Sequence, residues 1–196
     1  MNIKHDRRKV VITGLNLFCQ KGYSNLGIDE ICKSTGMTKG AFYNSFKSKE
    51  QFLLEGISTY SEQNIKRIEK QLQPLNELSP FKRLKQFYIQ MLESQPKNNF
   101  SGCFINNMMS ELGFINDNVG ILTTKEYEKF INAITPTILE AQKNNEIIDS
   151  IPATAIAELL HTTFYGILTR IKSSRDFQQG KQTLNLLLNN LKTNPK

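Results

Sequence analysis

The sequence is poor in cysteine, and the three cysteines it has, Cys19, Cys32 and Cys103, are widely spaced. An odd number at this spacing fits neither a disulfide framework nor a zinc-binding motif. The first nine residues carry four cations and lack the apolar segment of a secretory signal. No apolar run approaches the roughly 20 residues that a membrane-spanning helix needs. We therefore expect a protein of the reducing bacterial cytoplasm, with no part in a membrane.

Signatures of catalysis and of metal binding are also absent from the sequence. There is no glycine-rich phosphate loop, no set of histidines and cysteines at metal-ligand spacing, and no Gly-x-Ser-x-Gly segment. His161 stands alone in an apolar segment, where a packed, hydrogen-bonded histidine is more common than a base or a ligand. The sequence thus predicts no enzyme, no cofactor and no metal. A small helical enzyme remains an alternative that a screen for turnover would detect.

The composition that is present is ordinary for a globular protein of one or two small domains, with 39% hydrophobic and 22% charged residues. The net charge of +7, however, is unevenly distributed. Residues 1–50 contain nine Lys/Arg and four Asp/Glu, whereas residues 51–196 contain sixteen and fourteen. This asymmetry favours a polyanionic partner at the N-terminal end. Cations at a helix start oppose the helix dipole, so we also expect Arg7, Arg8 and Lys9 to contact phosphates.

Residues 27–46 predict two short helices joined by a tight turn. Gly36 stands where a left-handed residue would end the first helix, and Thr38 is a natural N-cap for the second. Phe42 and Phe46, four residues apart, would pack against the first helix and leave a small, polar and basic face outward. Such a face fits the major groove of DNA. An ordinary helical hairpin with a solvated face has the same spacing and remains open at this point.

Two segments favour the DNA-binding alternative: KGAFYNSFKSKEQFL at 39–53 and GLNLFCQKGY at 14–23. They closely resemble the signature of the tetracycline-repressor (TetR) family of bacterial transcription regulators, over roughly residues 8–55. The resemblance implies an all-α dimer whose chain folds into about nine helices. It also implies a three-helix, helix-turn-helix DNA-binding domain at 1–50 and a ligand-binding and dimerisation domain at 51–196.

The resemblance implies DNA-contacting residues in and just after the second helix of this motif. Three are expected to position the helix on phosphates: Thr38, Tyr43 and Lys49. Four are expected to face base edges: Lys39, Gly40, Ala41 and Asn44. Gly27 stands where the family usually carries a threonine, so one phosphate contact is missing here. A two-fold pair of such domains implies a pseudo-palindromic operator.

The remainder of the chain supplies many aromatic and methionine side chains that could line a ligand pocket. Any single one is more simply explained as core, but the resemblance implies a pocket among the helices predicted at 48–72, 80–94, 103–112 and 119–144. The residues predicted to line it are Phe87, Tyr88, Met91, Cys103, Phe104, Asn107, Met108, Tyr127, Phe130 and Phe164. Because these residues carry few charges, we expect a neutral or mostly apolar effector.

Cys103 is a candidate sensor of oxidants or electrophiles. Residues 101–107, together with Glu111, resemble a branch of the same family that includes electrophile-sensing repressors. We expect Cys103 in the first turn of a helix, where the dipole stabilises a thiolate. Oxidation or adduct formation there could shift the adjoining helix. The alternative is a small buried apolar residue, which is also our expectation for Cys19 and Cys32.

The two C-terminal helices, predicted at about 151–172 and 176–192, each carry an apolar stripe. Two such helices from each subunit would form a four-helix dimer interface, and packing within one chain is the alternative. The residues expected in the interface are Leu160, Phe164, Ile167, Leu168, Ile171, Leu184, Leu187, Leu188 and Leu191.

These features together predict a homodimeric, ligand-responsive transcriptional regulator, in the first instance a repressor. Its expected partners are double-stranded DNA, a second copy of the chain and a small-molecule effector. Effector binding or Cys103 modification should tilt the helix that starts at Ser48 and favour a state that cannot bind DNA. A helical protein–protein adaptor is the alternative function, and it would not need the polar, basic face of residues 38–49.

Overall fold

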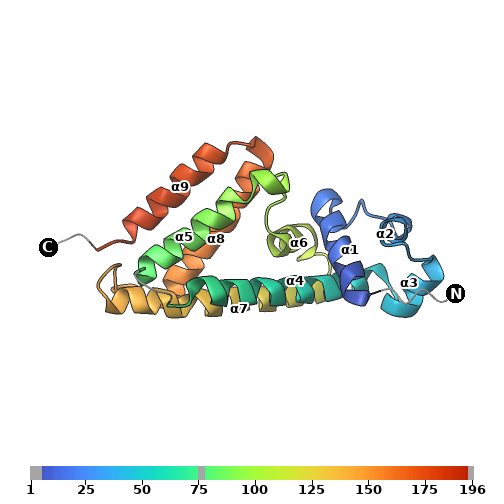
Figure 1. The fold of residues 1–196 in the computed structure, drawn as a ribbon, viewed down its shortest axis with the longest axis horizontal. Coiled ribbons are helices and arrows are strands. Elements are labelled where there is room, and N and C mark those ends of the chain that lie inside the picture. The colour runs from blue at the N-terminus through green and yellow to red at the C-terminus, as the bar shows by residue number, and fades with distance from the viewer. Residues whose placement is uncertain (1–5, 75–77, 194–196) are drawn as a thin grey trace. The chain divides into compact units, whose positions relative to one another are not determined.

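The computed structural model describes residues 6–74 and 78–193, and within these ranges the chain is almost entirely α-helical (Figure 1). The helices are α1 (Arg7–Lys21), α2 (Ile28–Thr35), α3 (Lys39–Phe46), α4 (Lys49–Leu72), α5 (Pro80–Glu93), α6 (Phe104–Leu112), α7 (Asp117–Lys143), α8 (Ala153–Ser174) and α9 (Phe177–Asn190). A 3₁₀ turn at Pro96–Asn98 and one isolated antiparallel bridge, Ile147 with Lys192, are the other regular features of the described residues. The all-α prediction is confirmed. None of the described helices has both the length and the apolar character needed to cross a membrane.

Contacts divide the chain into two compact units. The N-terminal unit contains the described residues up to 64 together with 104–127, and the C-terminal unit contains 65–103 and 128 onward. The units do not follow the division after residue 50 suggested by the sequence. The physical reason is that the long helices α4 and α7 run through both units, and that α6 packs on α1.

The N-terminal unit is built on a cluster of phenylalanine rings. Phe52 of α4 lies at its centre, with ring centroids 4.7 Å from Phe46, 5.3 Å from Phe42 and 6.0 Å from Phe18. All four rings are buried. A Cβ at Gly14 would lie 2.2 Å from Cζ of Phe52, so α1 can pack on this ring only through glycine. The cluster fixes α3 by its apolar side, as the spacing of its two phenylalanines predicts.

Short-range hydrogen bonds set the ends of the helices around α3. Gly36 has a φ of 72° and ends α2 in the left-handed conformation. The Thr38 hydroxyl accepts from the Ala41 N–H at 3.1 Å and begins α3. The Ser48 hydroxyl accepts from the Gln51 N–H at 3.0 Å and begins α4. All three caps agree with the sequence prediction, because each depends on residues no more than four positions apart.

The C-terminal unit is anchored by a buried arginine. Arg83 of α5 donates from Nε to the Leu72 carbonyl at 3.2 Å and from Nη1 to the Leu78 carbonyl at 3.0 Å. Its Nη2 lies 2.5 Å from a Glu140 carboxylate oxygen of α7. These bonds satisfy a guanidinium that would be costly to bury alone, and they join α5 to the ends of α4 and α7. Helices α8 and α9 lie side by side and complete the unit (Figure 1).

Candidate functional site

The outward face of α3 carries most of the residues predicted to contact DNA. Thr38, Lys39, Gly40, Tyr43 and Asn44 are exposed, and Ala41 and Lys49 are partly exposed. On the opposite side of the helix Phe42 and Phe46 are buried. The helix therefore presents a thin, mostly polar surface on which Tyr43 is the one aromatic side chain, of the kind that the major groove admits.

Lys39 is held by an ion pair that the sequence analysis did not foresee. Its Nζ lies 2.6 Å from Oδ1 of Asp29, in the first turn of α2. The hydrogen bond to Asp29 and the charge of that carboxylate raise the pKa of Lys39. Both side chains are well exposed, so the pair lies on the surface beside the outward face of α3.

Lys49, the first residue of α4, lies against the ring of Tyr23. Its Nζ is 4.0 Å from the ring centroid, which is cation–π geometry. Burial lowers the pKa of Lys49. The ammonium thus sits at the N-terminal end of a helix, where an anion would also meet free backbone N–H groups.

Arg7 is a structural residue of the N-terminal unit. Its guanidinium donates to both carboxylate oxygens of Glu55, at 2.7 and 2.5 Å, and to the Ser45 carbonyl at 2.9 Å. It also lies 4.4 Å from the ring centroid of Phe46. The expectation that Arg7 contacts phosphate stays a prediction, and in the structure the group joins α1 to α4 and to the end of α3. No short-range pattern in the sequence signals this use.

Glu111 of α6 holds the loop that follows α1. Its carboxylate accepts from the backbone N–H groups of Tyr23 at 2.9 Å and Ser24 at 2.8 Å. Burial alone would raise the pKa of Glu111, but these N–H groups and the charge of Lys49 lower it overall. Gly22 has a φ of 76°, and a Cβ there would lie 3.0 Å from a Glu111 oxygen. In the sequence Glu111 stands out only as part of a motif, whereas in the structure it ties α6 to the DNA-binding motif.

Cys103 lies directly before α6 rather than in its first turn, because the helix begins at Phe104. Its Sγ is 3.5 Å from the Tyr165 hydroxyl. The Tyr165 ring lies 4.6 Å from that of His161, whose Nδ1 is 3.1 Å from the Tyr88 hydroxyl. Burial lowers the pKa of His161 to about 4, so the imidazole is neutral at physiological pH. His161 is thus a packed, hydrogen-bonded side chain, as expected, and it lies in a line of polar groups that leads to the thiol.

The residues predicted to line an effector pocket fall in both units. Phe87, Tyr88, Met91, Cys103, Phe130 and Phe164 belong to the C-terminal unit, and Phe104, Asn107, Met108 and Tyr127 to the N-terminal unit. In the C-terminal unit the Tyr88 ring lies 5.2 Å from that of Phe87 and 5.1 Å from that of Phe164. The Phe130 ring lies 5.9 Å from His161. These side chains form one aromatic group, which includes His161, a residue left out of the prediction.

The apolar stripes predicted to meet a second subunit lie inside a single chain. Leu160, Phe164, Ile167, Leu168, Ile171, Leu184, Leu188 and Leu191 are each 6% exposed or less, and Leu187 is partly buried. The alternative left open from the sequence, packing within the chain, accounts for these side chains. Other positions of α8 and α9 face outward, among them Leu159, Gly166 and Leu186. The stripes are buried because α8 and α9 pack on each other and α9 packs on α5.

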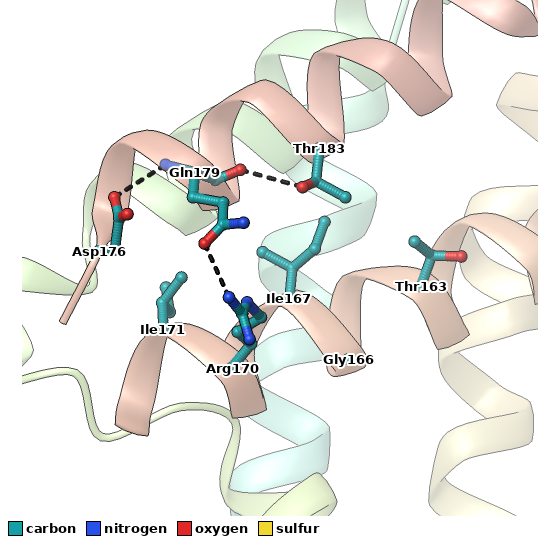
Figure 2. Close-up of a pocket in the computed structure, with 9 residues that line it drawn as sticks. Thr163, Gly166, Ile167, Arg170, Ile171, Asp176, Gln179 and Thr183 are labelled. Carbon is teal, nitrogen blue, oxygen red and sulfur yellow. Dashed lines mark hydrogen bonds between the residues drawn. The ribbon is translucent and has the colours of Figure 1, made fainter. Parts of the chain in front are cut away.

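A groove of about 260 Å³ lies along the outward side of α8 and α9 (Figure 2). Arg170 and Gln179 meet across it through a hydrogen bond of 3.0 Å. A Cβ at Gly180 would lie 2.8 Å from Cγ2 of Ile171, so the close approach of the two helices requires glycine there. At Gly166, by contrast, a Cβ would meet nothing within 4 Å. The groove therefore has free space next to the backbone of α8 at Gly166.

Comparisons with known proteins agree with this geometry. Residues 13–55 match the family model described as bacterial regulatory proteins, tetR family. The HTH-type transcriptional repressor DhaR of Mycobacterium sp. (strain GP1) is 25% identical, over 92% of this chain and 89% of its own. The regulatory protein TetR from Rhodobacter sphaeroides has a similar structure, with a TM-score of 0.84, 26% identity and coverage of 93% of this chain and 97% of that chain. The reduced form of E. coli NemR has a TM-score of 0.84 at 24% identity, covering 97% of this chain and 99% of that one, and shows the same fold.

These likenesses bear on the two alternative functions. The relatives that match along most of the chain are named as transcriptional regulators, not as enzymes or adaptors. The alternatives of a small helical enzyme and of a protein–protein adaptor therefore find no support.

Proposed function

The chain belongs to the tetR family of bacterial regulatory proteins, and on that basis we propose that it is a ligand-responsive transcriptional repressor. In this proposal it acts in the bacterial cytoplasm and binds a pseudo-palindromic operator as a homodimer. The observation that carries this proposal is the surface of α3. Its outward residues are polar and exposed, while its apolar side is fixed by buried phenylalanine rings. A rigidly held helix with a thin polar face suits insertion into the major groove.

In this proposal some residues in and around α3 contact phosphates and others face the base edges. Thr38, Tyr43 and Lys49 position the helix, and Lys39, Gly40, Ala41 and Asn44 face the base edges. Gly40 gives independent support. A Cβ at this position would meet only the Thr38 hydroxyl, at 4.0 Å, so the fold itself does not require glycine there. Close approach of a DNA duplex would explain the missing side chain.

The phenol of Tyr43 provides the first test. The Tyr43→Phe variant should bind DNA about tenfold more weakly, because a hydrogen bond to a charged phosphate contributes more than a neutral one. The loss should be equal for a duplex selected by the wild-type protein from random sequence and for an unrelated duplex. The slope of log affinity against log salt should not change, since the phenol is neutral, whereas Lys49→Met should lower it by about one. Unchanged affinity of Tyr43→Phe would remove this residue from the phosphate contacts.

We place the subunit contact on the outward faces of α8 and α9. On α8, Leu159, Thr163, Gly166 and Arg170 follow one another at helical spacing, and on α9, Gln179, Thr183 and Leu186 do the same. A two-fold interface brings the same patch of both subunits together. The apolar stripes that include Leu160, Ile167, Leu184 and Leu188 then form the layer beneath this surface.

We propose that the effector binds among the predicted pocket residues of the C-terminal unit and is neutral or mostly apolar. The aromatic group around Tyr88 and His161 supports this, because its rings are apolar and its imidazole is uncharged. Two helices offer a route to the DNA-binding motif. Helix α4 is separated from α3 by two residues and continues into the C-terminal unit. Helix α6 begins next to Cys103 and carries Glu111, which holds the loop after α1.

Modification of Cys103 is the second proposed signal, and N-ethylmaleimide is a suitable probe. The thiolate adds to the maleimide double bond, with a proton taken up at the neighbouring carbon and no leaving group. The bulk of the adduct would displace the residues around Sγ, including Tyr165, and shift the start of α6. We expect the reagent to release DNA from the wild-type protein and from Cys19→Ser, but not from Cys103→Ser. Release from Cys103→Ser at the wild-type rate would make Cys103 a structural residue.

A further inference from the structure

We propose that Asp29 is a specificity-determining residue, which restrains Lys39 so that it contacts base edges rather than phosphates. The inference rests on the proposed DNA-binding function and adds to it a residue outside α3. The observation behind it is the ion pair of 2.6 Å between Lys39 Nζ and Asp29 Oδ1, which joins the first residue of α3 to the first turn of α2.

Asp29 is a carboxylate beside the surface that would approach DNA, and its side chain is 73% exposed. A negative charge there brings no attraction to the phosphates of DNA, so its presence calls for another explanation. Asp29 favours the helix dipole of α2, but it is not the only acid to do so. The first turn of α2 already contains a second acid, Glu30, which favours the helix dipole and pairs with Lys21 of α1.

The chemistry of the pair supplies a purpose. A lysine ammonium has three N–H donors, so Lys39 can keep its bond to Asp29 and still donate to another acceptor. A neutral acceptor such as O6 or N7 of guanine is compatible with the nearby carboxylate. A phosphate is not, because it would place a second anion next to Asp29. The pair therefore disfavours contacts of Lys39 with phosphates, which every DNA sequence presents. It permits contacts with acceptor atoms that only some bases present.

Without Asp29, Lys39 would be a flexible cation at the edge of α3. Such a group finds a phosphate on any duplex and adds affinity without sequence information. The hydrogen bond to Asp29 raises the pKa of Lys39. Near neutral pH the lysine is therefore charged both in the free protein and in the DNA complex. The effect of Asp29 is thus on where the ammonium lies and not on whether it is protonated.

The test is the Asp29→Asn variant, measured on the duplex that the wild-type protein selects from random sequence and on an unrelated duplex of equal length. We expect about fivefold tighter binding to the unrelated duplex at 50 mM salt, with a salt slope steeper by about one. Affinity for the selected duplex should change by less than about twofold, so the specificity ratio falls. Glu62→Gln is the matched control, because it removes the same charge from an exposed position on α4, and it should alter neither ratio nor slope.

A double-variant cycle with Lys39→Met separates restraint of the lysine from simple repulsion. If Asp29 acts through Lys39, Asp29→Asn has no effect in the Lys39→Met background. An equal effect in that background, or equal tightening on both duplexes, would overturn the inference while wild-type selection of DNA stands. Failure of the wild-type protein to select any duplex would instead overturn the proposed function, and this inference with it.

Discussion

Replacing Phe52 by alanine is expected to lower the free energy of unfolding of the N-terminal unit by about 3–5 kcal/mol, as is usual for a buried phenylalanine. Phe52 is 1% exposed, and its ring contacts those of Phe18, Phe42 and Phe46. The vacated space cannot close easily, because α1 already rests on the ring through Gly14. Urea unfolding followed by circular dichroism measures the loss.

The same substitution at Phe114 is the matched control. Phe114 belongs to the same unit but is 97% exposed, so Phe114→Ala should change stability by less than about 0.5 kcal/mol. Phe52→Ala should also weaken DNA binding, because α3 loses the ring on which Phe42 and Phe46 pack. A cost below about 1 kcal/mol would show that these rings do not support α3 as the packing indicates.

Replacing Gly166 by arginine is expected to separate the subunits and to lower affinity for the selected duplex by about 100-fold or more. In a single chain a Cβ at Gly166 meets nothing within 4 Å, and arginine favours a helix more than glycine does. The folded chain should therefore tolerate the change. In a two-fold interface the new side chain would fill the groove and stand near its own copy and Arg170. The affinity for DNA falls because a monomer binds through one DNA-binding motif, without the second motif that the dimer holds close to the same duplex.

Gln86→Arg on the exposed face of α5 adds the same charge at a position outside α8 and α9 and serves as the control. Sedimentation equilibrium should give the mass of a dimer for the wild-type protein and for Gln86→Arg, and that of a monomer for Gly166→Arg. A dimeric Gly166→Arg variant with unchanged DNA affinity would place the subunit contact on another surface.

The N-terminal motif was predicted accurately because its signals are local. Gly36, Thr38 and Ser48 act on backbone groups within a few positions, and a cap needs no knowledge of the rest of the fold. The C-terminal helices were harder to interpret. An apolar stripe such as that of Leu184 and Leu188 shows that a helix buries one face, but not whether its neighbour is the same chain or a second copy. Here the neighbour is the same chain, so the proposed subunit contact moves to the outward positions.

The sequence by itself determined the helical class, the helix ends around α3 and the polar face of that helix, since all of these follow from residues within one or two helical turns. Only the tertiary structure decided the partners of its charged groups. Arg7 binds Glu55, 48 residues away, and Glu111 binds the backbone of Tyr23, 88 residues away. Lys39 likewise meets Asp29 only because the turn at Gly36 sets α2 against α3. A charged side chain looks the same in the sequence whether it will meet DNA or another part of its own chain, and the packing of the helices makes that choice.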